Sequence, residues 1–161
     1  MKRLLRMLFA TFVLTVAVLG VLRLTPLWDR MLSPGTLRPV DFATLELGAT
    51  GNEFLLCPPD LCAKASAHAE SPVFDRGVED LRVAVEAVAL NSGGVTKAGE
   101  EGGNTHFVAR TPLLRWPDWV TVRVLPAGEG KSTLAIYSRA VYGRRDFGVN
   151  QARIEDWLSR L

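Results

Sequence analysis

The pattern of apolar and polar positions changes along the chain, and its first part is an unbroken apolar run. Residues 7–22 contain no charged side chain, and a helix over 4–24 is roughly 30 Å long at about 1.5 Å per residue. Basic side chains precede the run with no acid among them: Lys2, Arg3 and Arg6. A cleaved signal peptide is the competing interpretation, although no small-x-small cleavage pattern follows Gly20. The pattern therefore predicts an uncleaved signal anchor over residues 1–24.

Residues 25–51 have a different composition, with prolines and glycines among mixed side chains. Pro26, Pro34 and Pro39 exclude a long helix, so this part is expected to be an extended tether. Apolar residues nevertheless recur from Leu45 onward, and part of the segment 42–57 is predicted to lie along the domain as an edge strand.

Two later segments have the periodicity of amphipathic helices. The first runs from Asp75 or Gly77 to Asn91, with Asp75 as the expected N-cap. Its apolar positions follow the spacing of one buried stripe: Val78, Leu81, Val85 and Val88. The second helix covers residues 150–161, with Asn150 as its expected N-cap and Ile154, Trp157 and Leu158 on one side.

Between these helices the apolar residues alternate with polar ones, as in half-buried strands. The predicted strands are four, separated by glycine-containing or proline-containing turns: 95–98, 105–111, 119–125 and 133–138. One packed face and one wet face are typical of an antiparallel meander. The predicted fold class is α+β, an α-β-β-β-β-α domain over residues 52–161 with two helices covering the apolar face of the sheet.

Charge separates the anchor from the rest of the chain. The whole chain carries a formal charge of +2. Without the four basic residues of the apolar segment, 15 basic side chains remain against 17 acidic ones. The basic character thus belongs to the anchor, and the pattern argues against a nucleic-acid partner.

Cys57 and Cys62 form an even, closely spaced pair, which in an exported domain is most simply a disulfide. Free thiols are one alternative. A metal site completed by His68 and His106 is another, but nothing in the spacing requires it, and no metal or cofactor is expected.

The densest set of functional groups lies at residues 138–153, which we call the arginine loop. Its arginines, Arg139, Arg144, Arg145 and Arg153, lie near the start of the last helix, where free N–H groups favour an anion. A structural interpretation is also open. In that interpretation Asp146 pairs with Arg139 or Arg153, Asn150 caps the helix, and two glycines supply unusual backbone angles: Gly143 and Gly148.

A second unusual segment connects two predicted strands at residues 111–119, which we call the tryptophan loop. Four large apolar side chains are uncommon in a strand connection, since loops normally run through water. They either cover the open end of the core or form an exposed patch for a lipid or a partner protein.

The arginine loop also has the pattern Ser-Arg-x-x-x-Gly-x-x-Asp-x-Gly-x-Asn-x-x-Arg, which begins at Ser138 and ends at Arg153. With the cysteine pair and Asp118, this pattern resembles the uncharacterised domain-of-unknown-function family numbered 1499, over roughly residues 52–161. The resemblance implies that Ser138, Gly143, Asp146, Gly148, Asn150 and Asp118 are motif residues. It implies no activity.

The leading functional hypothesis is a non-enzymatic envelope domain that binds an anionic or lipid-like ligand, or an envelope partner. Its expected location is the bacterial inner membrane, single-pass through residues 4–24, with the C-terminal domain in the periplasm. A small hydrolase or metal-dependent enzyme using His106 and Asp118 is the rival hypothesis. A purely structural envelope component is the third.

The positive residues before the apolar run generate a topological prediction. A reporter that is active only outside the cytoplasm should be active when fused after Leu161, because the basic N-terminus stays inside. The measurement is reporter activity in whole cells. Activity of a cytoplasm-only reporter at the same position would contradict the predicted orientation.

Overall fold

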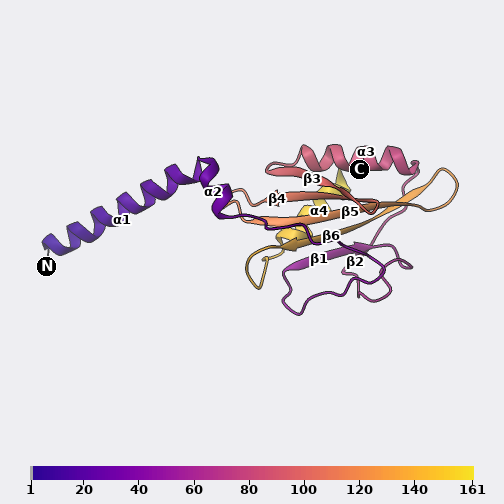
Figure 1. Ribbon diagram of the computed structural model, residues 1–161, viewed down its shortest axis with the longest axis horizontal. Helices are drawn as coiled ribbons and strands as arrows, with labels where there is room; N and C mark the ends of the chain where they lie inside the picture. The colour runs from indigo at the N-terminus through magenta and orange to yellow at the C-terminus, as the bar shows by residue number, and fades with distance from the viewer. Residues whose placement is uncertain (1) are drawn as a thin grey trace. The chain divides into compact units, whose positions relative to one another are not determined.

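The computed structural model describes residues 2–161, in two compact units that divide between Ser33 and Pro34 (Figure 1). The first unit contains α1 (Lys2–Arg23) and α2 (Pro26–Met31). Within α1, an 18-residue window has a mean hydropathy of 2.3 and no buried residue. Among the described residues, α1 is the one helix with the length and composition of a membrane span. The predicted apolar N-terminal helix is thus confirmed, and both a membrane anchor and a signal sequence fit it.

The second unit is built on one mixed, mostly antiparallel sheet, in the spatial order β2-β1-β6-β5-β4-β3 (Figure 1). Strands β3 to β6 form the predicted meander, β1 adds antiparallel to β6, and β2 adds parallel to β1. The six strands are β1 (Glu53–Cys57), β2 (Ala69–Glu70), β3 (Val95–Glu101), β4 (Asn104–Arg110), β5 (Pro117–Pro126) and β6 (Ser132–Ala140).

The prediction of about four strands was therefore too low. All five residues of β1 are buried, so β1 lacks the apolar-polar alternation that marks a half-buried strand. The two residues of β2 are too few to produce any pattern. Because β2 pairs with the outer side of β1, β1 lies inside the sheet rather than at the predicted edge.

Helices α3 (Val78–Leu90) and α4 (Val149–Ser159) cover one face of the sheet. Leu81 and Val85 of α3 are buried in the same core as Ile154 and Trp157 of α4. The Trp157 ring meets Phe107 of β4 edge-on, with ring centroids 5.8 Å apart. The predicted stripes of both helices therefore form this core in large part, but Val78 at the start of α3 is exposed. The N-cap of α3 is Gly77 rather than Asp75, whose carboxylate lies 2.8 Å from Lys131 at the surface.

The opposite face of the sheet is also covered, which differs from the expected wet face. Residues 34–52, which we call the strap, belong to the second unit, and they hold Phe42 in a second buried cluster. That cluster includes Leu55 of β1, Tyr137 of β6 and the cysteine pair. The second face is thus packed by extended chain instead of by helices, which apolar periodicity does not reveal.

Side-chain hydrogen bonds attach the strap to the sheet at separate points. Trp119 Nε1 donates to Pro34 O at 2.9 Å, and Asn104 Nδ2 donates to Val40 O at 2.7 Å. Glu53 accepts from the Tyr137 hydroxyl and from the amide of Gly48. The strap is thus bound to β4 through Asn104, to β5 through Trp119 and to β1 through Glu53.

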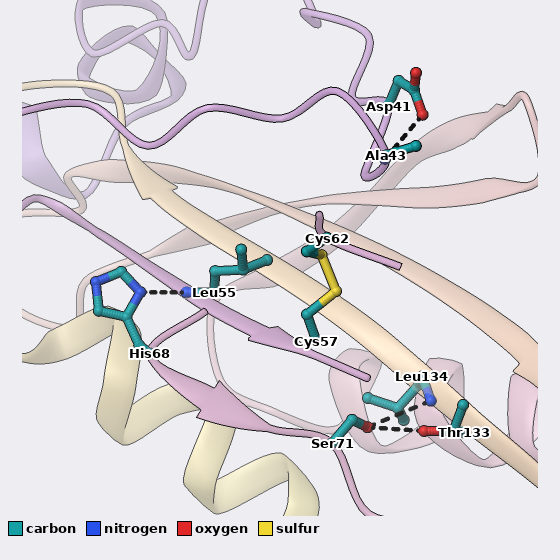
Figure 2. Close-up of a disulfide and its surroundings, with 9 residues drawn as sticks. All are labelled: Asp41, Ala43, Leu55, Cys57, Cys62, His68, Ser71, Thr133 and Leu134. Carbon is teal, nitrogen blue, oxygen red and sulfur yellow. Dashed lines mark hydrogen bonds between the residues drawn. A yellow bond between two sulfur atoms is a disulfide. The ribbon is translucent and has the colours of Figure 1, made fainter. Parts of the chain in front are cut away.

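Cys57 and Cys62 form the predicted disulfide at the end of β1 (Figure 2). His68 lies apart from the sulfurs, because its Nδ1 accepts from the amide of Leu55 at 3.1 Å (Figure 2). The structure therefore contradicts the free-thiol and metal alternatives. No cluster of three or more potential metal-ligating side chains occurs in the part of the chain that is described.

We expect the disulfide to stabilise the second cluster modestly. Removing it with the double substitution Cys57→Ser and Cys62→Ser should lower the free energy of unfolding by about 2 kcal/mol, since the closed loop is short. Denaturant unfolding of the full chain measures this. Thiol labelling of the native wild type should fail until a reductant is added, and labelling of two thiols without reductant would contradict the bond.

Candidate functional site

A buried ion pair joins α4 to the sheet below the two unusual loops. Arg153 Nη2 lies 2.5 Å from Asp118 Oδ2 of β5, and their side chains are 11% and 5% exposed. Arg153 Nη1 donates to Ser138 Oγ at 2.9 Å and to Asn150 Oδ1 at 2.8 Å. One guanidinium thus binds groups from β5, β6 and α4 simultaneously.

Asn150 and Asn52 extend this network to the end of the strap. Asn150 Oδ1 accepts from Ser138 Oγ at 2.5 Å, and its Nδ2 donates to Asn52 O at 3.2 Å. Asn52 Nδ2 in turn donates to Gly143 O in the arginine loop at 2.9 Å. Sequence reasoning did not single out Asn52, because its role is to bind backbone groups distant in the chain. We call these five residues the polar network: Asn52, Asp118, Ser138, Asn150 and Arg153.

Burial raises the pKa of the Asp118 carboxyl, while the positive charge of Arg153 opposes part of that effect. The buried carboxylate is compensated by Arg153, and Ser138 Oγ and Asn150 Oδ1 accept further hydrogen bonds from the same guanidinium.

Asp146 does not pair with an arginine, contrary to the structural interpretation of the sequence. Its two carboxylate oxygens accept from the amides of Gly148 at 3.1 Å and Asn150 at 3.0 Å. Asp146 therefore supplies the acceptors at the start of α4, whose N-cap is Gly148 with φ +80°. Asn150 lies inside the helix and does not cap it. The true partner of Arg153 is 35 positions away, whereas Asp146 was simply the nearest acid in the sequence.

The structure separates the four arginines that were considered as one anion site. Arg153 is used in the buried pair, and Arg139 lies on β6 opposite Glu53 of β1. Arg144 and Arg145 are exposed, and among the described residues neither has a hydrogen bond or ion pair. Only these two remain as exposed cations of the arginine loop.

The arginine loop and the tryptophan loop line one pocket of about 340 Å³. The tryptophan loop contributes Trp116, whose ring meets Tyr142 of the arginine loop at a centroid distance of 5.5 Å. Asp118 and Ala140 line the pocket from the ends of β5 and β6. The other lining residues are Thr111, Gly143, Arg145, Asp146, Phe147 and Val149. The two segments singled out in the sequence thus belong to one site.

Phe147 stands out in this pocket. Its side chain is 93% exposed, and its backbone adopts φ +54°, a left-handed conformation that is uncommon for a residue other than glycine. The Asp146 hydrogen bonds and Gly148 on either side hold the backbone there. A large aromatic side chain is therefore presented to solvent at the mouth of the pocket.

His106 and Asp118 do not share a site. Asp118 aligns with Ala109 on the helix-covered face of the sheet, whereas His106 aligns with Thr121 on the strap-covered face. His106 Nδ1 lies 3.0 Å from Thr121 Oγ1, and the residue is fully buried rather than at the surface. Burial lowers the pKa of His106 below its usual value. The strap, which the alternation of β4 does not reveal, accounts for that burial.

A family model described as a protein of unknown function (DUF1499) matches residues 53–161, more than half of the chain. The chain belongs to the DUF1499 family. The match spans all six strands with α3 and α4, and it includes four members of the polar network. Neither the curated proteins nor the solved structures contain a match. In this DUF1499 domain, most residues of the arginine-loop pattern therefore have a structural place. They either belong to the polar network or lie at the hydrogen bonds that Asp146 accepts at the start of α4.

The buried pair generates a stability prediction for the DUF1499 domain. Asp118→Asn should lower the free energy of unfolding by about 3 kcal/mol, because it leaves the Arg153 charge buried without a counter-charge. Asp156→Asn is the matched control: its carboxylate pairs with Arg160 at 2.6 Å on the surface and should contribute less than about 1 kcal/mol. Chemical unfolding of both variants provides the measurement. Equal losses would contradict the assigned role of Asp118.

Proposed function

We propose that this protein is a membrane-anchored envelope domain that binds an amphiphile with an acidic headgroup between its two loops. The observation that carries the proposal is the single pocket that the tryptophan and arginine loops line together. Its volume of about 340 Å³ lies near the lower end of the roughly 300–1,000 Å³ typical of small-molecule sites. An acyl chain or a comparable small apolar group suits such a volume.

The walls of the pocket support an apolar group in the ligand. Trp116, Tyr142 and Phe147 supply three aromatic side chains, and Val149 adds an aliphatic one. Aromatic residues bury large apolar areas and lose little conformational entropy, which makes them effective binding surfaces. Phe147 in particular exposes its ring where a ligand would cover it.

The charges around the pocket support an acidic headgroup. Asp118 is neutralised by Arg153, and Asp146 accepts two backbone amides, so both acids are already bound. Arg145 lines the pocket without an ion pair among the described residues. A guanidinium in that situation is available for a carboxylate or phosphate, which it binds through charge-assisted hydrogen bonds.

Two features support a location at the outer side of a bacterial inner membrane. The basic residues at the start of α1 favour a cytoplasmic N-terminus, which exports the remainder of the chain if α1 stays attached. The Cys57–Cys62 disulfide fits an oxidising compartment such as the periplasm. Membrane attachment would also keep the pocket near a supply of amphiphiles.

The arrangement of His106 and Asp118 on opposite faces of the sheet gives no support to the rival hydrolase. An envelope partner protein and a purely structural role are the other hypotheses. They differ from the proposal in one measurable respect, because neither requires a small amphiphile to enter the pocket.

Arg145 and Arg144 allow a matched test. The full chain in phosphatidylcholine nanodiscs should bind octyl phosphate more tightly than octyl glucoside, which has the same tail and an uncharged headgroup. Arg145→Gln should weaken octyl phosphate binding about tenfold, the loss expected for one charge-assisted hydrogen bond. Arg144→Gln should change it less than twofold, because Arg144 is equally exposed but does not line the pocket.

Binding is measured by tryptophan fluorescence, and the Trp116→Phe variant identifies the responding ring. If octyl phosphate enters the pocket, the Trp116→Phe variant should lose the fluorescence change that the wild type shows when octyl phosphate is added. Equal effects of the two arginine substitutions would argue for general surface attraction. A wild type that does not bind octyl phosphate would overturn the proposal.

A further inference from the structure

A second pocket lies on the other face of the sheet, between the strap and the turn that joins β3 to β4. Its volume is about 270 Å³. Asn104 and His106 line it from β4, and Arg123 lines it from β5. The remaining lining residues come from the strap, the end of β3 and the turn: Pro39, Val40, Asp41, Glu101 and Gly102. The first pocket is lined by Asp118, which lies on the opposite face, so the two pockets are separate.

Two buried polar atoms of these lining residues have no hydrogen-bond partner. They are Asn104 Oδ1 and His106 Nε2, and their residues are 4% and 0% exposed. Leaving such an atom unsatisfied costs about 1–3 kcal/mol, so native structures rarely contain them. Within residues 2–161 only one further buried side-chain atom lacks a partner, Trp157 Nε1 in the helix-covered core. Two of the three therefore belong to residues of one small pocket.

The surrounding hydrogen bonds define what these atoms offer to a ligand. Asn104 Nδ2 donates to Val40 O at 2.7 Å, which orients the amide so that Oδ1 is the free acceptor. His106 Nδ1 and the Thr121 hydroxyl are joined by a hydrogen bond, with the two atoms 3.0 Å apart. When Thr121 donates that hydrogen bond, Nε2 carries the proton and becomes a donor. The pocket then combines one buried acceptor with one buried donor.

Opposite charges flank the same pocket, and the negative charge of Glu101 opposes part of the lowering of the His106 pKa by burial. Arg123 is half-buried and Glu101 is exposed, and neither has an ion pair or side-chain hydrogen bond among the described residues. They do not pair with each other either. Asp41 is less available, since it accepts from the Ala43 amide at 3.1 Å and the Thr44 hydroxyl at 2.9 Å. A cation and an anion therefore both remain to interact with a ligand.

We propose that this second pocket binds a small zwitterion of the amino-acid type. The ligand carboxylate is recognised by the Arg123 guanidinium and by His106 Nε2–H. The ligand ammonium is recognised by the Glu101 carboxylate and by Asn104 Oδ1. This assignment matches each unpartnered group of the pocket with a ligand group of complementary charge and hydrogen-bonding role. It does not depend on the amphiphile site.

The chain contains two histidines, which allows a direct test on the full chain. With ¹⁵N-histidine labelling in detergent micelles, His106 reports the pocket and His68 serves as the internal reference. Adding L-alanine should shift the Nε2 resonance of His106 and leave both nitrogens of His68 unchanged. N-acetyl-L-alanine lacks the ammonium and L-alaninamide lacks the carboxylate, so each should bind at least tenfold more weakly than L-alanine.

Arg123→Gln should weaken L-alanine binding about tenfold, through loss of the charge-assisted contact with the carboxylate. Arg144→Gln should leave the affinity unchanged, because Arg144 lines neither pocket. Thermal melts of the two variants confirm that both remain folded. The proposal is overturned if L-alanine leaves His106 unshifted, if both histidines shift together, or if the two substitutions have equal effects.

Discussion

The ion pair between Arg153 and Asp118 is the constraint on which the end of the domain that carries the two loops depends. A carboxylate and a guanidinium removed from water are expensive unless every remaining hydrogen-bonding group is satisfied. Here Ser138 and Asn150 accept from the same guanidinium, and Asn150 is bound in turn to Asn52 O. The pair can therefore be buried only when β5, β6, α4 and the end of the strap are all in place, which couples these elements to one another.

This network also determines where the arginine loop lies. Asn52 holds Gly143 O near the start of the loop, and Asp146 holds the amides at its end. With both ends of the loop bound, the residues between them have few alternative backbone conformations. Phe147 stays exposed in a left-handed backbone conformation. The buried Arg153–Asp118 pair and the exposed Phe147 ring are thus linked through the same hydrogen-bonded residues. In this arrangement buried polar groups position an exposed apolar side chain.

The parts of this fold that the sequence predicted are those determined by local periodicity. Strands β4 to β6 place apolar side chains on the face that packs on α3 and α4, with a period of two, and the two helices return apolar stripes with the helical period of 3.6. Strand β1 has no alternation because it carries apolar side chains on both faces, with Phe54 and Leu56 in one buried cluster and Leu55 and Cys57 in the other. The strap has no period at all, so the burial of His106 beneath it was not foreseeable from the residues around His106.

The candidate site was predictable in its membership but not in its contacts. The sequence pattern identifies the motif residues Ser138, Asn150 and Arg153, whereas its structural interpretation pairs Asp146 with Arg139 or Arg153. Nearness in sequence favoured Asp146, but helix α4 turns Arg153 toward β5, where Asp118 lies. Likewise, the tryptophan and arginine loops are distant in sequence, and only the adjacency of β5 and β6 in the sheet makes them neighbours.

The potentially reactive side chains buried in this sheet are held in hydrogen bonds to other parts of the fold. Nucleophilic catalysis by a serine requires an adjacent base, and a histidine base requires a third group that orients it. In this domain the Ser138 hydroxyl donates to Asn150 and accepts from Arg153, while Asp118 neutralises the same arginine. His106 lies on the opposite face, with Thr121 as its partner. A serine, a histidine and an aspartate are all buried in this sheet, yet each is part of a hydrogen-bonded arrangement that stabilises the fold. Two arginines that have no ion pair among the described residues, Arg123 and Arg145, line the two pockets.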